Sequence, residues 1–196
     1  MSDSPPLQKD VRRRAVAAAV DLMANTPLAP KRYERQLLAR YQTGELTIDE
    51  VLALLEESTY HVLYRSRATQ VPTEADLQAL LEESRTYNAH HQLTGLLLYS
   101  DGQFVQLVEG AEAVVRDLYA QIQADPRHTQ VVTVSEGPGP QRWFADWHMA
   151  FGHVAAPELQ QTLQVVETQA PPRLPIEDPH LQTLLHAFGL PDHNLG

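Results

Sequence analysis

The spacing of apolar residues along the chain changes near residue 60. Before that point apolar positions recur every three or four residues, which predicts helices over residues 8–24 and 31–42 and a third helix after residue 47. Thr47-Ile-Asp-Glu50 has the form of a capping box, in which the Thr hydroxyl and the Glu carboxylate satisfy backbone amides at a helix start. We therefore expect residues 1–58 to form small amphipathic helices. A packing or dimerisation extension is the favoured interpretation, and a dedicated signalling module is the alternative.

From Tyr60 onward, strands alternate with helices. Residues 60–66 have the pattern of a strand, and a second capping box starts a predicted helix over residues 73–90. The apolar runs 93–100 and 103–109 are separated by Asp101-Gly102, a strong short-range signal for a β-hairpin. This part of the chain therefore predicts a strand, a helix and a hairpin in succession.

A helix over residues 112–124, a β-branched strand over 130–135 and a short strand over 147–151 complete the order βαββαββ. This order predicts an α+β, ferredoxin-like fold, in which two helices cover one face of a mixed sheet. Beyond it, residues 155–168 predict a helix and residues 181–188 a short amphipathic segment.

These patterns predict three regions. Residues 1–58 form the N-terminal helical extension, residues 59–152 the βαββαββ domain, and residues 153–196 a C-terminal helical tail. A chain of 196 residues is long enough for one main core with extensions of this kind.

Charge and composition argue against several classes of protein, among them nucleic-acid-binding and membrane-spanning proteins. Lys and Arg total 15 against 25 Asp and Glu, so the formal net charge is -10, which disfavours binding to nucleic acid or to an anionic membrane surface. The absence of cysteine excludes thiolate metal sites and cysteine nucleophiles in this chain. No apolar run approaches the roughly 20 residues that a membrane helix needs. We expect a cytoplasmic protein.

Several uncharged polar residues fall where the pattern predicts core. Extending the inward stripe of the 73–90 helix in steps of four places Ser84 and Asn88 on its apolar face. Strand alternation likewise places Gln106 between two apolar residues, and Tyr64 on the same face as an inward valine. Each alone fits a buried polar group bonded to nearby backbone. Together they would suit a flat heterocycle rich in carbonyls and ring nitrogens, and no carboxylate pair, Ser-His pair or phosphate loop accompanies them.

The residues around these positions resemble a known family, the BLUF domain, a flavin-based sensor of blue light. The likeness spans about residues 60–152 and involves several motifs in register. The matching segments are Leu63-Tyr-Arg-Ser66, Tyr87-Asn-Ala-His-His-Gln-Leu-Thr-Gly95, Leu98-Tyr-Ser-Asp-Gly-Gln-Phe-Val-Gln-Leu-Val-Glu-Gly110, Asp125-Pro-Arg-His128 and Asp146-Trp-His-Met149.

The resemblance implies a noncovalently held flavin, normally FAD, with FMN as the alternative, between the two helices of the fold. Tyr64 matches the photoactive tyrosine of the family and Gln106 its switching glutamine. Asn88 matches the asparagine that hydrogen-bonds the flavin ring, and Ser84 a nearby polar contact.

Two further pairs are implied by the same resemblance. Arg127 and His128 match the loop that approaches the flavin tail. Trp147 and Met149 match a pair on the last strand whose rearrangement carries the signal. The histidines of this region are interpreted as surface or rim residues, so no metal is expected.

The sequence therefore predicts a blue-light photoreceptor, without enzymatic activity, that signals by rearranging the hydrogen bonds among Tyr64, Gln106 and the flavin. The output is expected to pass to a regulatory protein partner or to a homo-oligomer interface, because the chain has no room for a cyclase or phosphodiesterase domain. The main alternative is a light-insensitive ferredoxin-like module that binds another small molecule. An acylphosphatase-like hydrolase would need a phosphate loop that the first strand lacks, and a DNA-binding regulator would need a basic surface.

Overall fold

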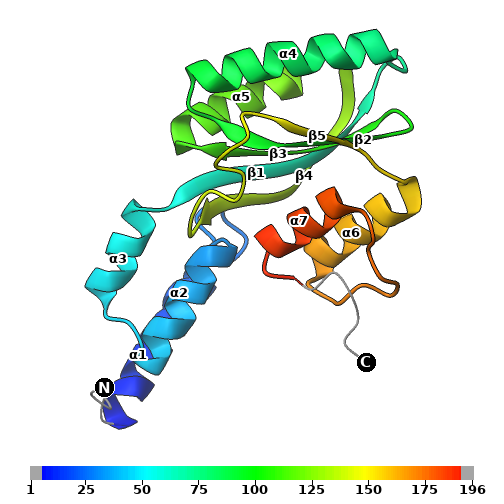
Figure 1. The fold of residues 1–196 in the computed structure, drawn as a ribbon. Coiled ribbons are helices and arrows are strands. Elements are labelled where there is room, and N and C mark those ends of the chain that lie inside the picture. Colours follow the sequence, from blue (N-terminus) through cyan, green and yellow to red (C-terminus); the bar gives the residue numbers. More distant parts are fainter. Residues whose placement is uncertain (1–5, 191–196) are drawn as a thin grey trace. The chain divides into compact units, whose positions relative to one another are not determined.

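The computed structural model describes residues 6–190 of the chain. The chain divides into two compact units: a helical one up to Thr59 that also takes in Gly137–Gln141, and a larger one formed by the rest. The helical unit contains α1 (Pro6–Met23), α2 (Arg32–Thr43) and α3 (Ile48–Glu56) (Figure 1). The three predicted N-terminal helices are thus present.

Local signals in the sequence account for the ends of these helices. Gly44 takes the left-handed conformation, with φ of 80°, and ends α2. Thr47 then accepts a hydrogen bond from Glu50 N, and the Glu50 carboxylate accepts one from Thr47 N, so the predicted capping box is formed. The small core of this unit is built on Leu37, Leu46 and Val51.

The larger unit is built on a five-stranded mixed sheet. Its strand order is β4-β1-β3-β2-β5, with β1 and β2 each antiparallel to β3 and with β5 parallel to β2. The strands are β1 (Thr59–Ala68), β2 (Thr94–Ser100), β3 (Gln103–Gly110), β4 (His128–Gly139) and β5 (Ala150–His153), and the helices of this unit are α4 (Glu74–His90), α5 (Glu112–Ala124), α6 (Ala156–Thr168) and α7 (Pro179–Ala187).

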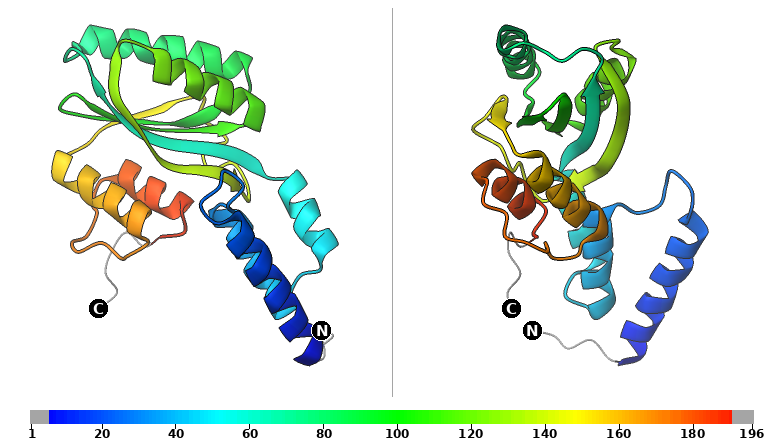
Figure 2. Two further views of the ribbon diagram at one scale, coloured as in Figure 1. Left: turned by 180° about the vertical axis from the view of Figure 1, so that it is seen from behind. Right: turned by 90° about the vertical axis from the view of Figure 1, so that its right-hand side faces the viewer.

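Helices cover both faces of this sheet. Figures 1 and 2 show α4 and α5 on one face and α6 and α7 on the other. The element order from β1 to β5 is the predicted βαββαββ, and the two helices inside it lie on one face, so the ferredoxin-like prediction is confirmed. The Thr73 capping box that starts α4 and the turn at Asp101-Gly102 are also present, the latter with φ of 46° and 80°.

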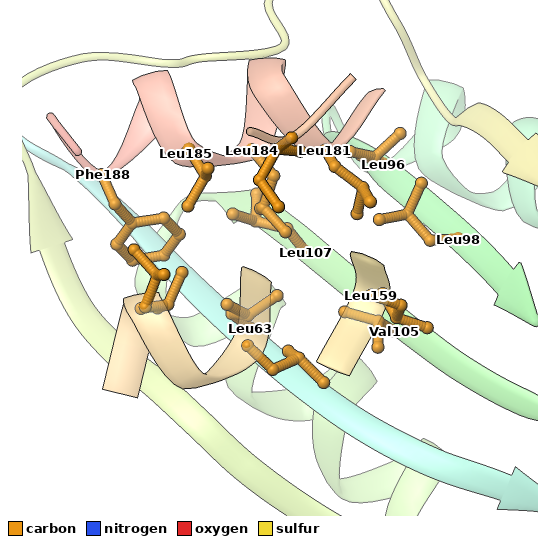
Figure 3. Close-up of a cluster of buried hydrophobic side chains, with 14 of the residues drawn as sticks. Leu63, Leu96, Leu98, Val105, Leu107, Leu159, Leu181, Leu184, Leu185 and Phe188 are labelled. Atoms are coloured by element: carbon orange, nitrogen blue, oxygen red, sulfur yellow. The ribbon is translucent and has the colours of Figure 1, made fainter. Parts of the chain in front are cut away.

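The C-terminal helices complete the main hydrophobic core. Alternate residues of the three inner strands point away from α4 and α5, and the apolar stripes of α6 and α7 cover them (Figure 3). The labelled members of this cluster are Leu63, Leu96, Leu98, Val105, Leu107, Leu159, Leu181, Leu184, Leu185 and Phe188. The sequence predicted a helix at residues 155–168 and a short amphipathic segment at 181–188, which is helical as α7, but it gave no indication of the surface against which they pack.

Two strand predictions need correction. The last strand was expected over residues 147–151, whereas β5 begins at Ala150, so Trp147 and Met149 lie ahead of it. Only backbone pairing with a distant strand fixes where such a short element begins, and local composition does not carry that information. β4 is longer than the predicted 130–135 and continues past Pro138, which an edge strand tolerates because its outer amides have no ladder partner.

We expect the tail to contribute directly to the stability of the sheet. Leu184 is 1% exposed, so Leu184→Ala should lower the free energy of unfolding by about 2–5 kcal/mol through lost burial and the cavity left behind. Leu174→Ala, at a leucine that is 67% exposed, should change it by less than about 0.5 kcal/mol. Urea unfolding followed by circular dichroism measures both, and equal effects would contradict this assignment of the core.

Candidate functional site

A cross-strand pair of polar side chains lies at the centre of the sheet. Tyr64 of β1 and Gln106 of β3 are directly opposite each other in the antiparallel register. The phenol of Tyr64, which is 2% exposed, donates a hydrogen bond to Gln106 Oε1. Strand alternation directs both side chains toward α4 and α5, as the sequence predicted.

The other end of the Gln106 amide faces the segment that leads into β5. Gln106 Nε2 lies 3.7 Å from the thioether sulfur of Met149, to which it donates. The three successive carbonyls of residues 147–149 each accept a hydrogen bond: from Gly95 N at 3.1 Å, from the Asn88 side-chain amide, and from Arg85 Nε at 3.1 Å. This segment is therefore held by β2 and α4 and is in direct contact with Gln106.

Two adjoining cavities open between the sheet and the helices on this face. The inner cavity, of about 170 Å³, is lined by Tyr64, Ser84, Asn88 and Gln106 together with apolar side chains of α4, α5 and the sheet. The outer cavity, of about 550 Å³, is bordered by the segment after β1, by α4 and by the loop before β4. Both cavities are lined by Leu80, Glu83, Phe104, Arg127 and His128.

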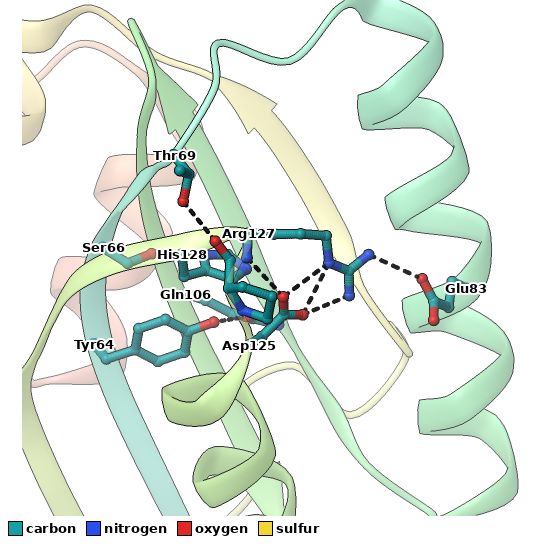
Figure 4. A network of polar contacts seen from close by, with 9 residues as sticks. Tyr64, Ser66, Thr69, Glu83, Gln106, Asp125, Arg127 and His128 are labelled. Carbon is teal, nitrogen blue, oxygen red and sulfur yellow. Dashed lines mark hydrogen bonds and ion pairs between the residues drawn. The ribbon is translucent and has the colours of Figure 1, made fainter.

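Charged side chains from α4 and from the loop before β4 also line the inner cavity and form a network of polar contacts (Figure 4). Arg127 donates to Asp125, with Nη2 at 2.6 Å from Oδ2, and lies 3.5 Å from a carboxylate oxygen of Glu83 on α4. His128 Nδ1 is 3.1 Å from the hydroxyl of Ser66, and the Thr69 hydroxyl donates to Pro126 O at 2.7 Å. The loop before β4 is thus attached to both β1 and α4.

The environment sets the protonation of these groups. Burial raises the pKa of the Tyr64 phenol far above its ordinary value, and nearby Tyr119 and Asp125 raise it further, so Tyr64 remains a hydrogen-bond donor. The hydrogen bond from Arg127 lowers the pKa of Asp125. Burial lowers the pKa of His128, although Asp125 opposes the shift, and the neutral imidazole is therefore favoured.

The arrangement suits an uncharged, planar, polar ligand. Tyr64, Asn88 and Gln106 offer donors and acceptors from three elements, and Leu97 and Ile122 supply apolar surface around them. Arg127 and His128 lie where the inner cavity meets the outer one, a position suited to a polar extension of such a ligand. The donor set therefore fits a heterocycle with ring nitrogens and carbonyls and a longer polar chain attached to it.

Most of the residues predicted from the sequence meet at this site. Tyr64, Ser84, Asn88, Gln106, Arg127 and His128 all line the inner cavity, and Met149 contacts Gln106. Trp147 differs: its side chain is 47% exposed and packs beside Phe144, with 6.1 Å between ring centroids. Only the backbone of Trp147 joins the network described above.

Other residues of the site were not singled out by the sequence analysis. Glu83 and Asp125 pair with Arg127, and Arg85 donates to Met149 O. The carboxylate of Glu109, buried on β3, accepts hydrogen bonds from Thr94 Oγ1 and from two successive backbone amides at 143–144, all at 2.7–2.9 Å. A charged residue inside an apolar strand was the available signal for Glu109, since such a group requires partners.

Among residues 6–190 no group of histidines and carboxylates could hold a metal ion. In the same part of the chain no helix is long and apolar enough to cross a membrane.

Comparison with known proteins identifies a family model that matches residues 59–150, described as BLUF, sensors of blue light using FAD. The photoactivated adenylate cyclase subunit beta of Euglena longa is 42% identical over 85 residues, which are 43% of this chain and 10% of that protein. The blue light- and temperature-regulated antirepressor BluF of Escherichia coli (strain K12) is 29% identical over 105 residues, 54% of this chain and 26% of that protein.

The chain thus spans about a tenth of the length of the cyclase subunit and about a quarter of the antirepressor. Among solved structures, BlsA in its photo-activated state superposes with a TM-score of 0.51 at 23% identity, covering 70% of this chain and 99% of that one. This likeness concerns the fold.

We expect the partly buried His128 to make stability depend on pH. Because its pKa is lowered in the folded chain, the unfolded chain binds more protons, and stability falls as the pH drops below the ordinary histidine value of about 6.5. His128→Gln should remove this component, so the wild type should lose more stability than the variant between pH 7.5 and 5.5. Urea unfolding at both pH values measures the difference, with His90→Gln, at an exposed histidine of α4, as control. An unchanged pH dependence in His128→Gln would contradict the assignment.

Proposed function

Residues 59–150 of this chain form a BLUF domain, a sensor of blue light using FAD, and from that premise we propose that the chain is a flavin-binding photoreceptor that signals through Gln106 and Met149. The domain is a sensor module rather than a catalytic one, and we propose that the chain as a whole has no enzymatic activity. Its output is proposed to be a change in contact with a regulatory protein partner or within a homo-oligomer.

The observation that carries this proposal is the buried relay from Tyr64 through Gln106 to Met149. The phenol donates to one end of the amide, and the other end of the amide donates to sulfur. A bound flavin would supply light absorption and, when excited, a strong oxidant. Asn88, Gln106 and Ser84 are placed to hold its ring in the inner cavity, with Arg127 and His128 toward its tail.

Reversal of the Gln106 amide provides two states of nearly equal volume. In the described state Oε1 accepts from Tyr64 and Nε2 donates to Met149 Sδ. Reversal directs a carbonyl oxygen at the thioether, which has no proton to donate, so the contact with Met149 loses its hydrogen bond. A buried hydrogen bond of this kind contributes about 1 kcal/mol, enough to change the favoured conformation of a flexible methionine.

Met149 connects this change to the edge of the sheet. It directly precedes β5, which pairs only with β2, and its carbonyl accepts from Arg85 of α4. A shift of Met149 would therefore alter both the start of β5 and its attachment to α4. Trp147 is the second candidate for this relay, because its carbonyl accepts from Gly95 N in the same segment.

The flavin is proposed to be FAD. The outer cavity of about 550 Å³ adjoins the ring site and supports a cofactor with a long polar tail, whereas FMN carries a shorter one. We propose a cytoplasmic location, without nucleic acid or membrane as partner, on the basis of the net charge of -10.

We expect the purified protein to show flavin absorption bands with a small, reversible red shift under blue light. Tyr64→Phe and Gln106→Leu should each retain the bands and lose the shift, because each removes one partner of the Tyr64–Gln106 hydrogen bond. Tyr60→Phe removes a hydroxyl from the same face of the same strand, outside the inner cavity, and should keep the shift. A protein that takes up no flavin, or a flavin spectrum indifferent to light, would favour the light-insensitive binding module instead.

Met149→Leu should separate the spectral change at the flavin from its transmission to β5. Leucine retains the apolar volume but removes the sulfur acceptor, so the red shift should persist while the light-induced change in amide hydrogen exchange at residues 150–153 is lost. Trp147→Phe should leave both responses intact if Met149 is the relay. Loss of the exchange response in Trp147→Phe alone would transfer that role to Trp147.

A further inference from the structure

A second open groove lies on the opposite face of the sheet from the flavin site. Its volume is about 590 Å³, and it runs between the strands β1 and β4 and one side of α6. All of its lining residues belong to the larger unit. The lining is mainly polar: Arg65, Ser66, Arg67, Gln103, Gln130, Val132, Gln160, Leu163, Gln164 and Glu167.

The outer boundary of this groove is an edge strand. β4 is the terminal strand of the sheet, so the outward N–H and C=O groups of its backbone have no strand to pair with. Gln130 takes the left-handed conformation, with φ of 52°, so the regular extended part of this edge begins after it. Between Val131 and Ser135 the strand contains no charged residue, no proline and no glycine, although edge strands are commonly protected by such residues. Val132, which lines the groove, is 42% exposed. This stretch is therefore suited to pairing with another extended chain.

The floor of the groove carries two cations without carboxylate partners. Arg65 and Arg67 alternate along β1 and point to the α6 face, and within residues 6–190 neither forms an ion pair or side-chain hydrogen bond. Glu167, the one acidic residue of the lining, is not bonded to either. The chain has a net charge of -10, so these two neighbouring arginines form a small positively charged area on an otherwise acidic protein.

The wall of the groove on α6 offers hydrogen-bonding groups, of which only Glu167 is charged. Gln160, Gln164 and Glu167 follow one another at helical spacing on the same side of α6. Gln130 and Gln103 add two more amides from the sheet. Such a lining can satisfy polar side chains, and its two arginines outweigh the one carboxylate of Glu167, so it would attract an anionic segment.

We propose that β4 and this groove form a docking site for an extended acidic segment of a partner protein, which adds a strand to the edge at residues 131–135 and directs carboxylates toward Arg65 and Arg67. Neighbouring strands lie about 4.8 Å apart, so an added strand would be about 10 Å from β1, a distance that an arginine and a glutamate side chain span together. Backbone pairing would supply affinity, and the arginines would supply the preference for acidic side chains.

Other occupants fit the observations less well. A free small anion would use the arginines but not the unpaired backbone of β4. A nucleic acid would meet the repulsive field of a strongly acidic chain. A docked helix has no free backbone groups to offer an edge strand. The proposal does not depend on light or on flavin, because none of its steps involves Tyr64 or Gln106.

The probe for this site is the fluorescein-labelled peptide Thr-Glu-Val-Glu-Val-Glu-Val-Thr, titrated with the full chain in the dark and followed by fluorescence anisotropy. Two control peptides accompany it: one with lysine in place of every glutamate, and one with proline in place of the first valine, which blocks strand pairing. We expect the acidic peptide to bind more tightly than either and to protect the amides of residues 131–135 from hydrogen exchange.

Arg65→Gln and Arg67→Gln should each weaken binding of the acidic peptide by roughly 1.5- to fivefold, the range for an exposed ion pair. Arg173→Gln removes the same charge from an exposed position outside the groove and should leave binding unchanged. Tyr64→Phe should bind the peptide as the wild type does, which separates this site from the photochemistry.

Four results would overturn the proposal. One is no binding of the acidic peptide, and another is equal binding of the lysine peptide. Binding without protection of residues 131–135 would indicate an anion site on the arginines alone. Protection of the same residues without peptide, rising with protein concentration, would show that a second copy of the chain occupies the edge.

Discussion

The function of the site depends on the register between β1 and β3. Antiparallel pairing places Tyr64 directly opposite Gln106, and a slip of one residue would turn one of the two side chains toward α6. The register is held by the apolar residues on both faces of β3, since Val105 and Leu107 must be covered by the tail while Phe104 and Val108 must be covered by α4 and α5. The burial of neighbouring apolar residues on β3 thus fixes the hydrogen bond between Tyr64 and Gln106.

The same strand connects the polar site to the segment before β5. Glu109 holds residues 143–144 through two backbone amides, and Gln106 contacts Met149 a few residues later. The first contact is a buried carboxylate with several donors, which is costly to break, whereas the second is a single weak bond to sulfur. The backbone at residues 147–149 is also held, through its carbonyls, so the side-chain contact of Met149 with Gln106 is the weak bond of this segment. Small changes at Gln106 would be expressed at that contact.

Features set by local chemistry could be predicted from the sequence. The capping boxes at Thr47 and Thr73 and the turn at Asp101-Gly102 depend on residues that are near neighbours in the chain, and each is present. Period-two alternation was sufficient to place Tyr64 and Gln106 on the cavity side of the sheet. The start of β5, the ion pairs of Arg127 and the cover that α6 and α7 provide depend on residues far apart in sequence, so no local pattern could show them.

The C-terminal tail also determines where the domain can be cut for use in a fusion protein. The match to the sensor family ends at residue 150, yet leucines of β1, β2 and β3 are buried by side chains of residues 159–188. A fusion protein cut at the family boundary would present an open apolar sheet to its new neighbour. The portable unit therefore extends to residue 190, and any effector grafted onto this domain has to be joined beyond α7 or has to bring a surface that replaces it.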